Sequence, residues 1–151
     1  RWLHINIDVS GAKKAIHAAP AEMAYALHRG LEESAIYTQG IFRWLLPVGV
    51  SGYLRQHVNY TWNDLLSVSV YPTADYAKYI EYGTRPHWTS VHNLEAWAAL
   101  KGINPYALQR SIAKRGTKAH PFLERTAEFS TGHAVRAVEA SLKDAIRRIN
   151  Q

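Results

Sequence analysis

The sequence predicts an α+β fold in which a long N-terminal helix and a C-terminal helix pack on a small antiparallel sheet, with a helical insertion. Apolar residues recur at a helical period over residues 23–45 and again over residues 135–149. Between these segments, residues 66–71 alternate strictly between apolar and polar side chains, which is typical of a strand. The chain has no linker rich in Pro, Gly or Ser, so residues 1–151 are expected to form a single domain.

The N-terminal part is expected to contain one strand and one long helix. Residues 3–8 alternate in polarity and predict a short strand. Residues 13–20 are expected to be helical or irregular, and Pro20 suits the first turn of the long helix. That helix is expected to end before Pro47 and to kink near Gly40. Its apolar face consists of Met23, Leu27, Leu31, Ala35, Phe42 and Leu45.

A β-hairpin is expected to follow the long helix. Residues 48–52 contain two glycines and predict a turn. The alternating residues 53–60 predict a first strand, and residues 66–71 predict its antiparallel partner before Pro72. The hairpin turn is expected around residues 63–64, where Asn is followed by Asp.

Residues 75–82 predict a short helix after the hairpin. Tyr76, Tyr79 and Ile80 share one face of this helix, which is expected to pack on the sheet. Gly83 is well placed to end the helix with a positive φ angle.

Three further helices are predicted towards the C-terminus. Residues 92–100 form the first, with Leu94 and Trp97 as core residues. Residues 105–114 form the second, with Asn104 as its N-terminal cap. The C-terminal helix follows Pro121, and its expected core face consists of Val135, Val138, Leu142, Ala145 and Ile149.

The composition excludes several classes of function. The chain has no cysteine, which excludes disulfides, thiolate catalysis and zinc sites built on Cys. It has no run of about 18 apolar residues, so no membrane span and no membrane partner are expected. The net charge of +6 fits three alternatives, namely nucleic acid, an acidic protein partner or a moderately basic soluble surface.

The sequence shows no catalytic signature. It contains no HExxH motif, no phosphate-binding loop and no serine in a nucleophile elbow. His120 and Glu124 have the spacing of a metal pair on a helix, but Pro121 favours His120 preceding the helix instead. The sequence therefore predicts a protein that is not an enzyme and that has no catalytic residue, no cofactor and no metal.

A basic segment lies between Glu95 and Glu124. It contains no acidic residue, and aromatic residues such as Tyr106 lie within it. Such a segment fits contact with phosphates, contact with an acidic protein surface, or an ordinary solvated helix face. Its basic residues are Lys101, Arg110, Lys114, Arg115 and Lys118.

Two short stretches of the sequence are similar to each other. Residues 83–87 read Gly-Thr-Arg-Pro-His, and residues 116–120 read Gly-Thr-Lys-Ala-His. Each stretch follows a predicted helix and precedes an aromatic residue. If both flank an insertion over residues 88–115, the two stretches are expected to lie close together in space.

Three motifs in this order resemble one family of phage proteins. Residues 47–55 resemble its "P-x-x-T-G-x-L-R" element, with Ser51 where Thr is usual. Residues 76–84 resemble its "Y-A-x-x-x-E-x-G-T" element, and residues 120–127 resemble its "x-P-F-L-x-P-A" element, with Thr126 in place of Pro. The family is the tail-completion, or neck, group of long-tailed phages, typified by the tenth gene product of an HK-type lambdoid phage and related to the lambda Z protein. The motif residues are Gly52, Leu54, Tyr76, Glu81, Gly83, Thr84, Pro121 and Phe122.

The resemblance, over residues 20–149, implies a non-enzymatic structural protein of the virion, made in the cytoplasm of a bacterial host. It implies tail completion and head–tail joining at the neck, by copies assembled in a hexameric or twelve-fold-related ring. The other implied partners are neighbouring neck, tail-terminator or tail-tube proteins. The alternative function is that of a basic module that binds nucleic acid through non-specific contact with DNA. The expected assembly interface consists of Arg85, His87, Trp88, Arg110, Lys114, Arg115 and Lys118.

Overall fold

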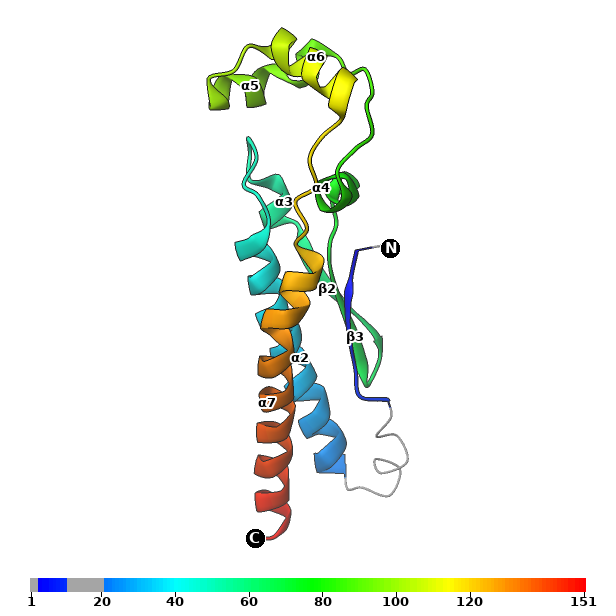
Figure 1. Cartoon of the computed structure of the whole chain (residues 1–151). Helices are drawn as coiled ribbons and strands as arrows, with labels where there is room; N and C mark the ends of the chain where they lie inside the picture. The colour runs from blue at the N-terminus through cyan, green and yellow to red at the C-terminus, as the bar shows by residue number, and fades with distance from the viewer. Residues whose placement is uncertain (1–2, 11–20) are drawn as a thin grey trace.

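The computed structural model describes residues 3–10 and 21–151, and it has the predicted α+β architecture (Figure 1). The prediction for residues 13–20 lies outside the described residues. The elements, in chain order, are β1 (Ile5–Asp8), α2 (Ala21–Leu45), α3 (Tyr53–Gln56), β2 (Val58–Asp64), β3 (Ser67–Pro72), α4 (Ala77–Tyr82), η2 (Val91–Asn93), α5 (Glu95–Lys101), α6 (Pro105–Arg115) and α7 (Leu123–Ile149).

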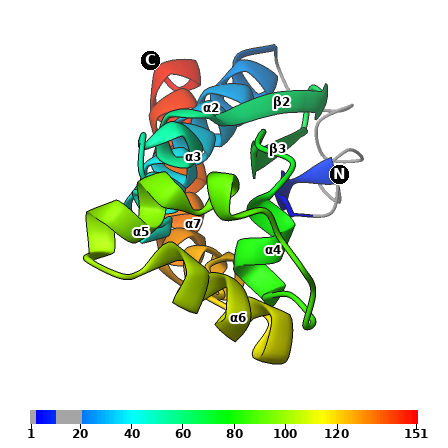
Figure 2. The same ribbon diagram turned by 90° about the horizontal axis from the view of Figure 1, so that it is seen from above.

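The two long helices, α2 and α7, lie side by side and run in opposite directions (Figure 1). Viewed from above, the three strands lie on one side of this helix pair (Figure 2). The helices α5 and α6 lie beyond the end of the pair at which α2 stops and α7 starts (Figure 1). We call residues 88–115, the predicted insertion, the arm, and we call the remaining described residues the body.

Small residues allow α2 and α7 to pack closely. A Cβ atom added to Gly30 of α2 would lie 2.8 Å from the Cα atom of Val138 in α7, so the two backbones nearly touch. The neighbouring hydroxyl of Ser34 is buried, and it donates a hydrogen bond of 2.7 Å to the Gly30 carbonyl oxygen. The buried residues of α7 are also small, namely Thr126, Ser130, Ala137, Ser141 and Ala145.

The predicted core face of α7 is therefore partly wrong. Ala145 is buried as expected, and Val138 and Leu142 are half-buried. Val135 and Ile149, in contrast, are exposed. The contact with α2 follows the small residues because the distance between two packed helices depends on the side chains at their contact.

The predicted long helix is confirmed as α2, which ends before Pro47 and continues unbroken through Gly40. Phe42 of α2 is fully buried and meets Phe122 edge to face, with ring centroids 6.0 Å apart. These two aromatic residues join the end of α2 to the start of α7. The other buried residues of this core come from α2, α3, α4, the strands β2 and β3 and segments outside the helices and strands, namely Leu3, Leu31, Ala35, Leu46, Leu54, Val58, Val68, Val70, Ala74 and Ala77.

The sheet has the order β1-β3-β2 and is antiparallel throughout. The central strand β3 is buried along its whole length, with Val68 and Val70 in the core. The opposite face of the sheet carries a polar network. The Asn63 side-chain amide in this network donates hydrogen bonds to Asn6 Oδ1 at 3.0 Å and to Ser69 Oγ at 2.8 Å.

The hairpin differs from its prediction in two places. Residues 53–56 form the short helix α3 instead of a strand, because Gly52, with a φ angle of 69°, turns the chain before Tyr53. The turn lies at residues 65–66, after the predicted position. Asp64 stabilises this turn, since its Oδ1 accepts a hydrogen bond of 2.7 Å from the Leu66 amide.

The short helix α4 buries a different face from the predicted one. Its buried residues are Ala77 and Glu81, whereas Tyr76 and Tyr79 are 44% and 52% exposed. Ile80 is half-buried against the core. The tyrosines point outward because the helix is anchored by the Glu81 carboxylate instead of by its aromatic face.

The arm contains α6 as predicted, but the segment of the arm that precedes α6 differs from the prediction. The Asn104 side chain caps α6 by accepting hydrogen bonds from the Tyr106 and Ala107 amides. The predicted helix over residues 92–100 is divided into η2 and α5. In α5 the fully buried residue is Ala98, whereas Trp97, predicted as a core residue, is 37% exposed.

Candidate assembly site at the root of the arm

The two similar Gly-Thr stretches meet at the root of the arm. Thr84 and Thr117 pair as antiparallel strands, although they are 33 residues apart in the sequence. The Thr84 amide donates to the Thr117 carbonyl oxygen at 3.1 Å, and the Thr117 amide donates to the Thr84 carbonyl oxygen at 3.2 Å. Their hydroxyls are 2.9 Å apart. The predicted proximity of the two stretches is thus confirmed, and we call this pairing the Thr84–Thr117 crossing.

A glycine precedes each threonine because the crossing leaves no room for a side chain. Gly83 has φ and ψ angles of 70° and −177°, and Gly116 has angles of 72° and −159°. This combination of angles is essentially restricted to glycine. A Cβ atom on Gly83 would overlap the Thr117 carbonyl oxygen, and one on Gly116 would overlap that of Thr84. The positive φ angle predicted for Gly83 is therefore confirmed.

The histidines of the two stretches are held in similar ways. The His120 amide donates a hydrogen bond of 2.7 Å to the carbonyl oxygen of Ile80, in α4. The His87 amide makes a longer bond of 3.4 Å to the carbonyl oxygen of Ile112, in α6. Each stretch therefore bonds to the helix that precedes the other stretch, which gives the similarity in sequence a structural cause.

Glu81 joins the second motif to the third. Its carboxylate is buried, and Oε2 accepts hydrogen bonds from the Phe122 amide at 2.7 Å and the Leu123 amide at 3.1 Å. These amides belong to the start of α7, where the first turn has no partners within the helix. A carboxylate at this end also interacts favourably with the helix dipole. Glu81 therefore caps α7 across a sequence separation of 41 residues.

Residues of the first motif hold the end of α2. The Arg55 guanidinium donates hydrogen bonds to the carbonyl oxygens of Trp44 and Leu46, at the end of α2. Leu54 is buried in the core beside them. The three motifs therefore stabilise the ends of both long helices at the same end of the body, below the arm.

The seven predicted interface residues divide between the root of the arm and α6. Arg85, His87 and Trp88 follow the crossing; all three are exposed, and Trp88 is 71% exposed. The His87 ring Nδ1 is 2.8 Å from the Arg85 carbonyl oxygen. The remaining four, Arg110, Lys114, Arg115 and Lys118, are exposed on α6 or just after it.

Sequence reasoning missed an exposed aromatic surface on α2 and α7. Trp44 and Phe129 pack edge to face with ring centroids 5.7 Å apart, and both remain largely exposed. Tyr37 stacks on His133 at 3.7 Å, and His133 Nε2 is 4.0 Å from Glu33. The only signal in the sequence was the presence of large aromatic residues beside the predicted core face of each helix.

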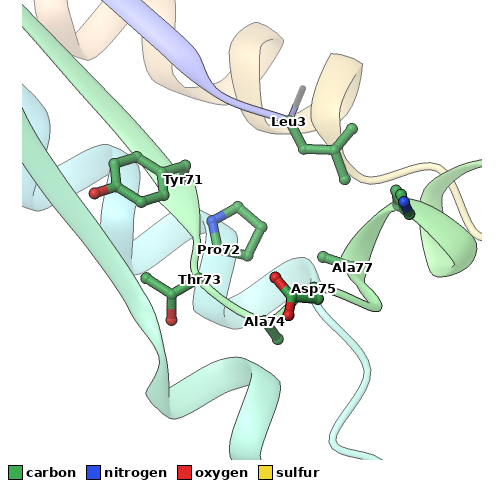
Figure 3. A pocket seen from close by; sticks show the side chains of 8 residues that line it. Leu3, Tyr71, Pro72, Thr73, Ala74, Asp75 and Ala77 are labelled. Carbon is green, nitrogen blue, oxygen red and sulfur yellow. The ribbon is translucent and has the colours of Figure 1, made fainter. Parts of the chain in front are cut away.

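A cleft of about 530 Å³ opens between the end of β3 and the start of α4. Figure 3 shows Leu3 on one side of this cleft, and Pro72, Thr73, Ala74, Asp75 and Ala77 on the other. Asp75 and Lys78 are its charged lining residues. Next to Asp75 in sequence, the pKa of the Tyr76 phenol is raised above its usual value of 10.0, first by partial burial and then by the neighbouring Tyr53. The unfolded chain therefore loses this proton at a lower pH than the folded protein. The free energy of unfolding is expected to fall as the pH rises above 10.

The part of the chain that the structure describes contains no group of three or more His, Asp or Glu side chains arranged to hold a metal ion. Within the same residues, none of the helices is both long and apolar enough to cross a membrane. No family model, no curated protein and no solved structure matches the chain.

Proposed function

We propose that the chain is a non-enzymatic structural protein of a phage virion, which acts at the neck in tail completion and head–tail joining. The observation that carries this proposal is the meeting of the three motifs on which the resemblance rests. Glu81 of the second motif bonds to Phe122 of the third, and Arg55 of the first motif holds the end of α2 beside them. Residues distant in the sequence thus contribute to one structural unit, in the helix–hairpin–helix order that the family implies.

The proposed mechanism is assembly of several copies around the tail axis, next to neck, tail-terminator or tail-tube proteins. A closed ring requires one surface of each copy to contact a different surface of the next copy. Two exposed surfaces fit this requirement. The first is the root of the arm, with Arg85, His87 and Trp88, and the second is the aromatic surface of α2 and α7, with Trp44 and Phe129. Aromatic residues and Arg are enriched in protein interfaces.

Two measurements test the proposal. Light scattering of the purified protein over a range of concentrations is expected to show a multi-copy ring, alone or with isolated tails. Electron microscopy of particles made by the encoding phage after deletion of the gene is expected to show filled heads separated from tails. A normal yield of joined virions without the protein would rule the proposed role out.

A further inference from the structure

The positive charge of the chain is concentrated in the arm and the two segments that lead to it. Residues 85–118 contain six of the eighteen Lys and Arg side chains but only one of the twelve Asp and Glu side chains, Glu95. This segment therefore carries +5 of the net charge of +6. Glu95 itself lies 3.5 Å from the His92 ring, on the first turn of α5.

The helix α6 presents part of this charge as a stripe. Tyr106, Arg110 and Lys114 follow one another at intervals of four residues, so they share one face of the helix. All three are exposed, whereas the opposite face buries Gln109 and Ile112. Among the described residues, no hydrogen bond or ion pair engages the side chain of Arg110 or Lys114. In contrast, the neighbouring Arg115 guanidinium donates to the Ser111 hydroxyl at 2.6 Å.

The helix dipole accounts for only part of this pattern. Cations in the last turn of a helix are favourable, which explains Lys114 and Arg115. The same effect explains Lys101 in the last turn of α5. It does not explain Arg110 in the middle of α6 or Lys118 beyond the helix, nor the lack of carboxylates between Glu95 and Glu124.

We propose that the stripe of Tyr106, Arg110 and Lys114 on α6 binds the phosphate backbone of duplex DNA. The phosphate backbone of DNA carries negative charge at high density along its whole length, and a surface with Lys and Arg but no carboxylate complements it. The position of α6 beyond the ends of the long helices also allows a rod-shaped ligand to reach it (Figure 1). The contacts are to phosphates, so they hold DNA without selecting a sequence.

This inference goes beyond the assembly role and does not depend on it. The surface between copies proposed above uses the root of the arm and the aromatic surface of the body. Arg110 and Lys114, which are predicted from the sequence to lie in the assembly interface, are here assigned to DNA instead. The DNA surface uses the outward face of α6. A chain that forms rings but does not bind DNA would overturn only the DNA proposal, and a chain that binds DNA without forming rings would leave it standing.

The test measures binding of the full chain to a fluorescent 30-base-pair duplex of arbitrary sequence at a series of salt concentrations. The double variant R110Q/K114Q removes one Arg and one Lys spaced by four residues on α6. The control K143Q/R147Q removes one Lys and one Arg with the same spacing, both on α7. The two variants have equal net charge, and circular dichroism checks that both are folded.

The parent chain is expected to bind with an affinity that falls steeply with salt. The slope of log affinity against log salt is expected to decrease by about one unit for each phosphate that the variant no longer neutralises, hence by about two for R110Q/K114Q and by little for K143Q/R147Q. Three results would overturn the proposal. They are no binding by the parent chain at low salt, an equal decrease in the control, or equally effective competition by poly-glutamate at matched charge, which would indicate an acidic protein partner instead.

Discussion

The carboxylate of Glu81 is buried because it replaces hydrogen-bond partners that the first turn of α7 lacks. Its Oε2 accepts from two consecutive amides, and the residue that precedes the helix, Phe122, has no side-chain acceptor with which to cap it. Thr126, one turn later, bonds its hydroxyl back to the Phe122 carbonyl oxygen at 2.7 Å. Glu81, which the resemblance identifies as a motif residue, therefore has a structural role that its position in α4 does not indicate.

Removing this cap is expected to destabilise the protein. Glu81→Ala leaves one buried and one partly buried amide without this partner and should lower the free energy of unfolding by about 2–3 kcal/mol. Glu81→Gln keeps a side-chain oxygen as acceptor but loses the charge, so it should cost less, about 1 kcal/mol. Urea unfolding followed by circular dichroism measures both. Equal stability of Glu81→Ala and the parent chain would show that the cap contributes nothing.

The glycines of the crossing allow a second test at the scale of single residues. Gly116→Ala introduces a methyl group where the Thr84 carbonyl oxygen lies, whereas Gly102→Ala meets no atom within 4 Å. Both glycines have positive φ angles, 72° and 65°. We expect Gly102→Ala to cost about 1 kcal/mol from backbone strain alone. Gly116→Ala should cost about 2–4 kcal/mol, since overlap is added to strain.

Thermal unfolding of the two alanine variants compares these costs directly. If Gly116→Ala is no less stable than Gly102→Ala, the close approach of the two chain segments at the crossing does not exist in solution.

Among the elements, those with a strong local signal were predicted correctly. The strand β3 has strict alternation, α6 has an Asn cap followed by Pro, and α2 has a long apolar period. Residues 53–56 were mistaken for a strand because a four-residue helix is too short to show a period. The face of α7 that contacts α2 was predicted only in part, since the Ser and Thr residues on it carry no hydrophobic pattern.

The candidate site was predictable only in part for the same reason. The two similar Gly-Thr stretches, on either side of the predicted insertion, predicted that these segments lie close together, but not that they pair as strands. The outward direction of Tyr76 and Tyr79 was not predictable, because it follows from the bonds of Glu81 to residues 122–123. Such long-range bonds leave no local trace in the sequence.

The contact between α2 and α7 can be tested with two glycines of the same helix. Gly30→Ala places a Cβ atom 2.8 Å from the Val138 Cα, whereas Gly40→Ala places one in open space. Alanine favours a helix over glycine by about 1 kcal/mol, so Gly40→Ala should stabilise the protein by up to that amount. Gly30→Ala should instead destabilise it by about 1–3 kcal/mol, because the overlap outweighs the propensity.

Chemical denaturation of both variants decides between these effects. A Gly30→Ala variant that is as stable as Gly40→Ala would mean that α2 and α7 can separate without a penalty.

The arm as an element is expected to be removable. The backbones of Thr84 and Thr117 each donate a hydrogen bond to the other. The two residues that flank the loop of a β-hairpin with a two-residue loop have the same arrangement. Replacing residues 85–116 by Asn-Gly should therefore close the chain in a type I′ turn and leave the body folded. We expect the melting temperature to change by less than about 5 °C, with the decrease in helical signal confined to α5 and α6. Loss of cooperative unfolding would show that the body requires the arm.

At the scale of the whole molecule, folding and assembly should be separable. Arg85→Ala removes an exposed side chain at the root of the arm, so the melting temperature is expected to stay unchanged. If this residue lies in the core of the interface between copies, assembly should weaken by at least about fivefold. Light scattering over a concentration series measures the change, and Arg147→Ala on α7 is the control. A variant that unfolds instead would show that Arg85 supports the fold.

The Thr84–Thr117 crossing also bears on the order in which the chain folds. Closing a flexible loop of 33 residues costs about 3 kcal/mol of chain entropy, before the bonds at its ends offset any of it. The helices α5 and α6 contact each other and are close in sequence, so they can form early and hold the two ends of the loop near one another. The Glu81 cap, which spans 41 residues, would then form after the arm. The arm would thus act as a nucleus that brings the start of α7 to the rest of the protein.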